Sequence, residues 1–528
     1  MKAWPTTDPA GEKSSPQPPP ASDRSRRVLG NALWEWMGLG ANMITGLVLA
    51  PFLIRKLGAE AYGIWSLVFS AMGYYSLADF GFRAAAVRFV AHYDAQRRQD
   101  QINELINSLL VYFSAVSGGL LLLSAVLARY ATRLFQVSAA QADDFGPFVF
   151  LVGVTLAITV STGLFSGSLE GFQRFDVSNT IRALIAIARC SGLAVLLALG
   201  YGLVAMAAWT VAVFVAGYVA YFQALRRVFP QLRLSLRLAK RTTLRETLGF
   251  SSYTFLTTLA YQSIEQCPPL VLAYFHPLAF VGYYSLPLRL VEHTADTLSR
   301  ISVVATPEAA RLAASGRLEV LPRLAIYANR YCLTLYMPAV LALLVYGPEI
   351  MEALAKEEFA AHAAPLIPVL LFGVATTTGA QYASATILVG LARQQRYAQG
   401  VAAEAACNLI GLLLLVPRYG PLGAAAVTAS LMFLVRGVFT PWLICRVLGF
   451  PLGTYLRSIF VRPMMTAAPV LVLLWLWKTA VWPAPGLAHL IAVCGATTAL
   501  YLGAATVTCL EPEHRGLLWR WVFRRFST

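Results

Sequence analysis

The stretch Leu203–Ala224 reads LVAMAAWTVAVFVAGYVAYFQA and contains no charged side chain. Its 22 residues are enough for one crossing, since a helix needs about 20 apolar residues to pass through the hydrocarbon core of a membrane. Only helices and closed barrels satisfy their backbone polar groups in lipid, and the apolar residues here run continuously instead of alternating. The stretch therefore predicts a membrane-spanning helix.

Similar stretches recur along the whole chain. Hydrophobic residues make up 58% of the 528 residues and charged residues only 13%, against about 25% charged residues in ordinary soluble domains. We therefore predict an all-α membrane protein with about 14 transmembrane helices. The expected spans are 31–54, 61–81, 107–128, 146–167, 182–200, 203–224, 248–274, 282–304, 324–346, 363–389, 398–416, 422–445, 463–481 and 488–509.

The net charge of +16 is concentrated in the short segments outside these spans. If the N-terminus is cytoplasmic, 31 of the 42 Lys and Arg residues lie on the cytoplasmic side and seven on the opposite side. Such a bias is typical of membrane topology and needs no nucleic-acid partner to explain it. The even number of spans then predicts that both termini are cytoplasmic.

The two halves of the chain resemble each other at an offset near 218 residues. The matched positions are Gly63 with Gly282, Ser66 with Ser285, Asp79 with Asp296, Arg83 with Arg300, Gly171 with Gly390, Arg174 with Arg393 and Gly202 with Gly420. The offset covers six crossings, so both halves enter the membrane in the same sense. Transporters built from such parallel repeats hold their substrate between the halves and rock one half against the other.

The repeat predicts the domain organisation. We expect two parallel six-helix lobes, two additional C-terminal helices and a proline-rich N-terminal tail without ordered structure. The expected boundaries are 1–27 for this cytoplasmic tail, 28–225 for the N-lobe, 226–247 for a basic cytoplasmic linker, 248–446 for the C-lobe, 447–510 for the last two helices and 511–528 for an interfacial cytoplasmic tail.

The eighth expected span carries most of the charge that lies within the membrane. Arg289, His293, Asp296 and Arg300 follow one another at helical spacing, so they share one face, and Glu292 borders this stripe. Charged groups within spans usually face a partner or a water-filled cavity. The stripe therefore predicts either ion pairs that tie helices together or the lining of a basic passage.

Two further acidic positions lie at or near the spans. Asp79 and Arg83 are four residues apart at the cytoplasmic end of the second span, which favours a structural pair. Glu265 stands among apolar residues in the seventh span. It is interpreted either as a protonation site coupled to an ion gradient or as a partner of Arg289 or Arg189.

Arg189 and Arg436 lie inside the fifth and twelfth spans, about two turns from the cytoplasmic boundary. One interpretation is that both side chains extend outward to the interface. The other is that they bind an anion such as a diphosphate, because the guanidinium group offers two donors in a fixed fork.

The motifs of catalysis and metal binding are missing from the sequence. It contains no phosphate-binding GxxxxGK[ST] loop and no HExxH or GxSxG motif, and its seven cysteines include no CxxC pair. The loops on the outer side are too short for a catalytic domain. We therefore expect neither an enzyme nor a protein with a metal or other cofactor.

The segment from Asn31 to Tyr93 resembles the opening of a known transporter family. The resemblance is carried by Pro51, Leu57-Gly58, Tyr62-Gly63-Ile64-Trp65 and Asp79-Phe80-Gly81-Phe82, and further on by Gly282-Tyr283-Tyr284-Ser285, Pro307-Glu308 and Arg418-Tyr419-Gly420. The family is that of the Wzx-type O-antigen and exopolysaccharide flippases. It forms part of the multidrug/oligosaccharidyl-lipid/polysaccharide exporter superfamily, and the resemblance covers roughly residues 28–450.

This resemblance implies a protein of the bacterial inner membrane that moves an undecaprenyl-diphosphate-linked oligosaccharide from the cytoplasmic to the periplasmic leaflet. Alternating access would be driven by a proton or sodium gradient, for O-antigen, capsule or exopolysaccharide synthesis. Besides membrane lipids, candidate partners are a polysaccharide polymerase or glycosyltransferases. The candidate substrate-binding residues are then Arg189, Arg289, His293, Arg300 and Arg436, and the candidate ion-coupling residues are Glu265, Glu292 and Asp296.

Two alternatives have the same expected fold. One is a multidrug or small-molecule exporter, for which Glu265, Glu292, Asp296 and Glu404 would supply acidic groups. The other is a flippase for a peptidoglycan precursor, which differs only in its cargo.

Overall fold

The computed structural model consists of helices and connecting loops, with no strand in the part of the chain that it describes. Most of the first expected span and Asp79 lie outside this part. The described residues are 50–68, 70, 82–135, 137–139, 141–302, 305–391, 393, 395–480 and 486–516.

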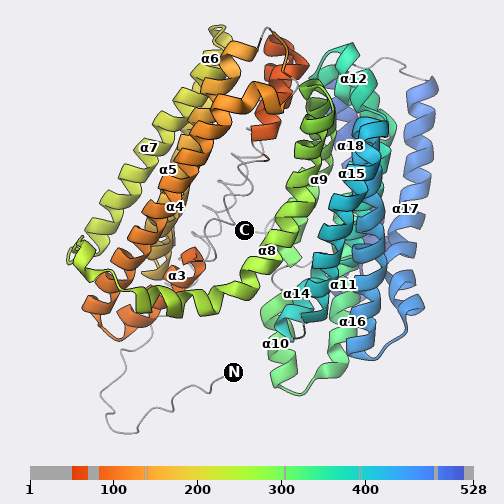
Figure 1. The fold of residues 1–528 in the computed structure, drawn as a ribbon. Helices are drawn as coiled ribbons and strands as arrows, with labels where there is room; N and C mark the ends of the chain where they lie inside the picture. The colour runs from red at the N-terminus through yellow and green to blue at the C-terminus, as the bar shows by residue number, and fades with distance from the viewer. Residues whose placement is uncertain are drawn as a thin grey trace, which may run out of the picture.

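The helices form two groups that stand beside each other (Figure 1). The group on the left of the view holds α3–α7, and most of their sequence is continuously apolar, as lipid-facing helices require. Its helices are α3 (Phe82–Ala95), α4 (Gln99–Leu134), α5 (Ala142–Gly171), α6 (Phe175–Ala198) and α7 (Leu203–Val228). A further helical segment covers residues 50–68.

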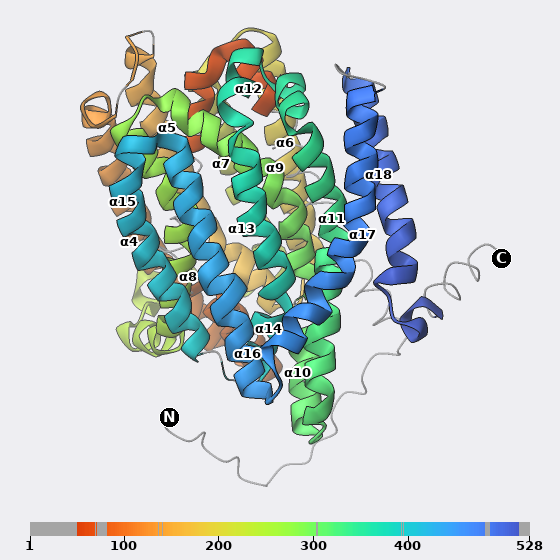
Figure 2. The ribbon, with the colours of Figure 1, turned by 90° about the vertical axis from the view of Figure 1, so that its right-hand side faces the viewer.

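The second group begins with α8, which runs across from the first group before it turns upward beside α9 (Figure 1). In the second view, α17 and α18 lie together at one side of this group (Figure 2). Its elements are α8 (Arg241–Phe275), α9 (Leu278–Ser302), α10 (Ala305–Ala314), α11 (Leu321–Leu354), α12 (Glu357–Ala363), α13 (Leu366–Ala380), α14 (Tyr382–Gly390), α15 (Gln395–Leu431), the π-helix η3 (Met432–Phe439), α16 (Thr440–Leu448), α17 (Leu452–Ala480) and α18 (Leu487–Thr508).

Nine helical stretches of the described residues are long and apolar enough to cross a membrane. One of them, Gln395–Leu448, contains two expected spans. These are separated at Gly420, whose φ of 53° is readily adopted only by glycine. A second left-handed glycine, Gly58 with φ of 89°, lies between the first two expected spans. The total of fourteen stays a prediction, because most of the first span is not described.

The two groups touch each other at one end through a crossing of glycines. A Cβ added at Gly63 would overlap the carbonyl oxygen of Leu278, and one added at Gly282 would lie 2.9 Å from the carbonyl oxygen of Ala59. Ala59 and Leu278 are 219 positions apart, as are Gly63 and Gly282. The contact of Gly63 with Leu278 is therefore equivalent to the contact of Gly282 with Ala59, as expected when a local two-fold axis relates the two.

Side chains extend this contact and seal it. Tyr62 lies edge-on to Phe359, with ring centroids 6.3 Å apart, and Tyr283 lies against the other side of that ring at 5.0 Å. Arg55 donates a hydrogen bond to the carbonyl oxygen of Ala353 at the same end. Toward the opposite end the two groups of helices diverge (Figure 1). The charge bias predicts that the diverging end faces the cytoplasm.

Candidate functional site

A buried ion pair forms the centre of the candidate site. The guanidinium group of Arg436 donates from Nε to Glu404 Oε1 at 2.8 Å, and the two side chains are only 8% and 0% exposed. Glu404 lies on α15, whereas Arg436 lies on the π-helix η3. The wider turn of a π-helix is frequent at functional sites, because it reorients a side chain within an otherwise regular helix.

Three polar side chains from neighbouring helices surround this pair. The hydroxyl groups of Tyr261 and Tyr397 are hydrogen-bonded to each other, and the amide nitrogen of Gln381 donates to both, at 3.4 Å to Tyr261. The guanidinium group of Arg436 also lies over the Tyr261 ring, 5.9 Å from its centroid. The site thus joins α8, the junction of α13 and α14, α15 and η3.

Glu265 belongs to the same site. It lies one turn beyond Tyr261 on α8 and interacts electrostatically with Arg436. The sequence analysis suggested Arg289 or Arg189 as the partner of Glu265. The structure instead gives an interaction with Arg436, another of the predicted substrate-binding residues. Carboxylates on α8 and α15 therefore both act electrostatically on Arg436.

Several polar atoms of this site lack a hydrogen-bond partner among the described residues. They are Glu404 Oε2, Arg436 Nη2 and Gln381 Oε1. A buried donor or acceptor without a partner costs about 1–3 kcal/mol. The arrangement can therefore gain stability by binding a proton or a small cation at the oxygens, or an anionic oxygen at the free guanidinium nitrogen.

The charged stripe of the eighth span lies on α9. Arg289 is exposed and acts electrostatically on both His293 and Tyr62 of the other group of helices. Glu292 and His293 are half-buried and interact with neighbouring groups. The stripe thus begins beside the sealed end. The backbone of the two remaining stripe residues continues along α9, and their side chains lie outside the described part: Asp296 and Arg300.

Arg83 forms an ion pair with a residue that the sequence analysis did not single out. Its Nη2 lies 2.7 Å from Glu170 Oε1 on α5, and the same oxygen accepts from Arg182 at 2.9 Å and from the Ser178 hydroxyl at 3.2 Å. The expected partner, Asp79, is not described, so that pairing stays a prediction. Glu170 ties α3, α5 and α6 together.

Arg189 lies apart from the Arg436 site. It is half-buried on α6, in the first group of helices, and has interactions of its own. The predicted cavity arginines are therefore distributed over both groups: one on α6, two on α9 and one on η3. Their role in binding stays a prediction.

The sequence analysis named Glu404 only as an acidic group for the exporter alternative, and it did not single out Tyr261, Gln381 or Tyr397. Glu404 carried a usable signal, because it is a carboxylate in the middle of the eleventh expected span. The two tyrosines and the glutamine gave none, since such residues are common in helices that pack against one another.

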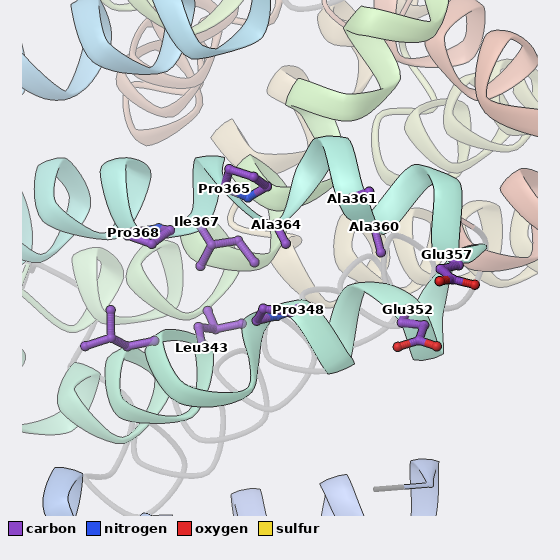
Figure 3. A pocket seen from close by; sticks show the side chains of 11 residues that line it. Leu343, Pro348, Glu352, Glu357, Ala360, Ala361, Ala364, Pro365, Ile367 and Pro368 are labelled. Carbon is purple, nitrogen blue, oxygen red and sulfur yellow. The ribbon is translucent and has the colours of Figure 1, made fainter. Parts of the chain in front are cut away.

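A cavity of about 460 Å³ lies at the sealed end, between α11 and the segment from α12 to α13 (Figure 3). Alanine, proline, leucine and isoleucine side chains line most of it, and the carboxylates of Glu352 and Glu357 lie at one end. None of the predicted site residues lines this cavity. Its lining offers no cation for a phosphate, so it is not the candidate site.

The family model for polysaccharide biosynthesis proteins matches residues 28–312, more than half of the chain. The chain belongs to this family. Within the polysaccharide biosynthesis protein family, the match covers the whole first group of helices and continues through α9.

Two relatives were found by sequence. A protein of Shigella flexneri described as "Putative O-antigen transporter" is 24% identical over 153 residues, which are 29% of this chain and 36% of the relative. An uncharacterized membrane protein of Methanocaldococcus jannaschii is 20% identical over 436 residues, 78% of this chain and 84% of the relative. The chain thus matches about a third of the Shigella protein's length and most of the archaeal protein's.

Solved structures with the same fold are transporters and not enzymes. The inward closed conformation of the lipid II flippase MurJ gives a TM-score of 0.70 at 12% identity, over 90% of this chain and 98% of that one. An inward-facing multidrug transporter of the MATE family gives 0.64 at 13% identity, over 77% and 95%. At these identities the likeness establishes the fold of the exporter superfamily, and the cargo is a separate question.

Proposed function

We propose that this polysaccharide biosynthesis protein is a flippase that moves an undecaprenyl-diphosphate-linked oligosaccharide from the cytoplasmic to the periplasmic leaflet. The observation that carries the proposal is the Arg436–Glu404–Glu265 site inside the second group of helices. Membership of the family suggests that the cargo contains a saccharide. The two groups of helices suggest that the cargo passes between them.

The physical problem in flipping is the polar head group, because charge is costly in the hydrocarbon core. Two guanidinium groups of the second group of helices would compensate a diphosphate. Arg289 on α9 is exposed, so it is available to an anion. Arg436 is buried, so it is available only when its contact with Glu404 changes.

The same exchange suggests how an ion gradient would drive transport. Protonation of a carboxylate beside Arg436 would release part of the guanidinium group. After the cargo leaves on the outer side, a proton from outside would bind the carboxylate, and its release to the cytoplasm once the protein faces inward again would reset the site for the next cargo. In this scheme Glu404 and Glu265 are the coupling residues, and Glu292 and Asp296 stay candidates on α9.

The second candidate function is export of drugs or other small molecules. It is favoured by the likeness to multidrug transporters and by the buried carboxylate of Glu404. A cation-exporting site would use carboxylates without a permanent positive charge among them. Arg436 neutralises Glu404 and interacts with Glu265, which favours an anionic cargo.

Reconstitution of the full chain in vesicles tests the proposal. Fluorescent undecaprenyl-diphosphate oligosaccharide is incorporated in the membrane, and its exposure at each surface is followed with a membrane-impermeant quencher. We expect ion-gradient-dependent exchange for the wild type and none for empty vesicles. Export of a cationic dye without movement of the lipid-linked saccharide would favour the second function and contradict the first.

A deletion strain provides the matching test in cells. We expect loss of surface polysaccharide and accumulation of the lipid-linked oligosaccharide on the cytoplasmic leaflet. Normal polysaccharide together with increased drug sensitivity would contradict the flippase proposal.

A further inference from the structure

A basic cavity of about 400 Å³ opens between α11 and α17, at the end that the charge bias assigns to the cytoplasm. Four arginines and one carboxylate line it, together with apolar and hydroxyl side chains. Arg323 and Arg330 come from α11, Arg457 and Arg462 from α17, and Glu511 from the segment that follows α18. The cavity lies in the second group of helices, and α17 is the helix farthest from the first group (Figure 1).

Helix geometry explains why these charges converge. Arg323, Tyr327 and Arg330 are spaced four and three residues apart, so they lie on one face of α11. On α17, which packs along α11, Val461 and Arg462 lie three and four residues after Ser458, so these side chains also share one face. Both faces meet near the starts of their helices.

Arg330 is the anchor of the cavity. It is only 2% exposed, and its Nη2 donates to Glu511 Oε1 at 2.9 Å. The Tyr327 and Tyr331 rings flank its guanidinium group, with centroids 5.1 and 5.6 Å away. Its Nε is buried and has no hydrogen-bond partner within the described residues. A buried guanidinium group is thus held in place with one donor left over.

The charges of the cavity do not balance. One oxygen of Glu511 accepts from both Arg330 and Arg462, each at 2.9 Å. Arg323 and Arg457 are exposed, and neither forms an ion pair with a described carboxylate. A single carboxylate therefore faces four arginines, and the remaining positive charge calls for an anion with several acceptor oxygens.

We propose that this cavity binds the phosphate head group of an anionic phospholipid of the cytoplasmic leaflet. Basic pockets between transmembrane helices on this side of a membrane suit such head groups. Ile326 and Val461 give the glycerol end of the lipid apolar walls. The cavity is separate from the Arg436 site, so the lipid would act as a structural or regulatory ligand and not as cargo.

Lipid binding to the purified full-length protein tests this proposal without any transport measurement. Phosphatidylglycerol and phosphatidylcholine are titrated against the protein in detergent, and retained lipid is counted by native mass spectrometry. The test variant is Arg323→Gln/Arg457→Gln, which removes two exposed side chains without a described partner. The matched control is Arg241→Gln/Arg245→Gln, which removes two exposed arginines at the start of α8.

We expect the wild type to retain phosphatidylglycerol and to release phosphatidylcholine. The test variant should lose about 30-fold in affinity for phosphatidylglycerol, at about 1 kcal/mol for each of the two cations removed near a lipid surface. The control should lose less than about twofold. Equal losses in both variants would mean that only the general surface charge acts, and would overturn the proposal.

A competition experiment distinguishes a phospholipid of the bilayer from a carrier lipid as the ligand of the cavity. Undecaprenyl diphosphate carries the same phosphate chemistry on a different tail, and inorganic diphosphate carries it on none. Neither should displace phosphatidylglycerol at equal concentration if the site is built for a bilayer lipid. Displacement by either compound in the wild type, and not in the test variant, would assign the cavity to that compound and overturn the phospholipid proposal.

Discussion

At the scale of single residues, the buried Arg436–Glu404 ion pair determines which substitutions destabilise the protein. Both side chains are buried, so each charge depends on the other for compensation. Removing one partner of a buried pair leaves an uncompensated charge and costs about 3–5 kcal/mol. Replacing both partners with uncharged side chains of similar size is often neutral.

This asymmetry gives the first prediction. Glu404→Gln should lower the free energy of unfolding by about 3–5 kcal/mol, and Glu404→Gln/Arg436→Met should restore most of that loss. Chemical denaturation in detergent measures the stability. If the pair serves transport, the double variant should be stable and inactive in the vesicle assay. A stable double variant with wild-type transport would show that the pair is only structural.

Glu511 gives a prediction about pH. The hydrogen bond from Arg330 is the main cause that lowers the pKa of the Glu511 carboxyl below its ordinary value, and Arg462 adds to it. A carboxyl group whose pKa is lowered by folding stabilises the folded state above its unfolded pKa, and this contribution is lost as the pH falls through the folded pKa.

We therefore expect Glu511→Gln to reduce stability by about 1–2 kcal/mol at neutral pH. The difference from the wild type should shrink as the pH falls below about 4.3, the ordinary pKa of a glutamate. Thermal unfolding of both proteins across this range measures it. A difference independent of pH would mean that the charge of Glu511 contributes nothing.

The sequence predicted these residues unevenly. It identified Arg436 and Glu265 as unusual, because a charge within an apolar span is conspicuous. It could not identify their partners, since Glu404 and Arg436 are 32 positions apart and meet only when α15 and η3 fold together. A partner in space is decided by the packing of helices, and periodicity along one helix contains no information about it.

At the scale of elements, the crossing of the helix over 50–68 with α9 controls the sealed end. No side chain fits between Gly63 and the Leu278 carbonyl, or between Gly282 and the Ala59 carbonyl. Overpacking a close contact typically costs about 1–3 kcal/mol, which shifts an equilibrium between two conformations by about 5- to 150-fold.

The third prediction follows from this crossing. Gly63→Ala and Gly282→Ala should each push the helices apart and disfavour the inward-facing conformation, which reduces transport. A cysteine in place of the buried Phe359 should then react with a membrane-impermeant maleimide from outside. Gly118→Ala is the matched control, because nothing lies within 4 Å of its added Cβ. Equal labelling of the test and control variants would contradict a gate at the glycines.

Element boundaries were predictable where glycine or charge marks them. The expected turn between the eleventh and twelfth spans lies at Gly420, and the one between the first two lies at Gly58. The π-helix at Met432–Phe439 was not predictable, because its residues fit an α-helix equally well and only neighbouring packing selects the wider turn.

At the scale of the whole molecule, the orientation in the membrane follows from the charge bias. The exposed Leu236 of the basic linker should face the cytoplasm, and the exposed Ala361 of α12 should face the outside. In a background without native cysteines, Ala361→Cys should react with an impermeant maleimide in intact cells, whereas Leu236→Cys should react only after permeabilisation. The reverse pattern would invert the topology and the direction assigned to transport.

The two-lobed arrangement was the part most accessible from sequence. The repeat offset covers an even number of expected spans, so the two halves are predicted to enter the membrane in the same sense. In the structure the two groups of helices lie side by side (Figure 1). The sequence could not predict which end is sealed and which end diverges, because the sequence is the same in every conformation of the transport cycle.

The glycine crossing also bears on how such a chain could have arisen. In a dimer of identical half-length subunits, one glycine would lie against the partner subunit around a two-fold axis and serve both sides of the contact. Joining two gene copies end to end would free each side to mutate alone. Gly63 and Gly282 each lie against a backbone carbonyl of the other helix, so the contact has the geometry of a homodimer joint within one polypeptide.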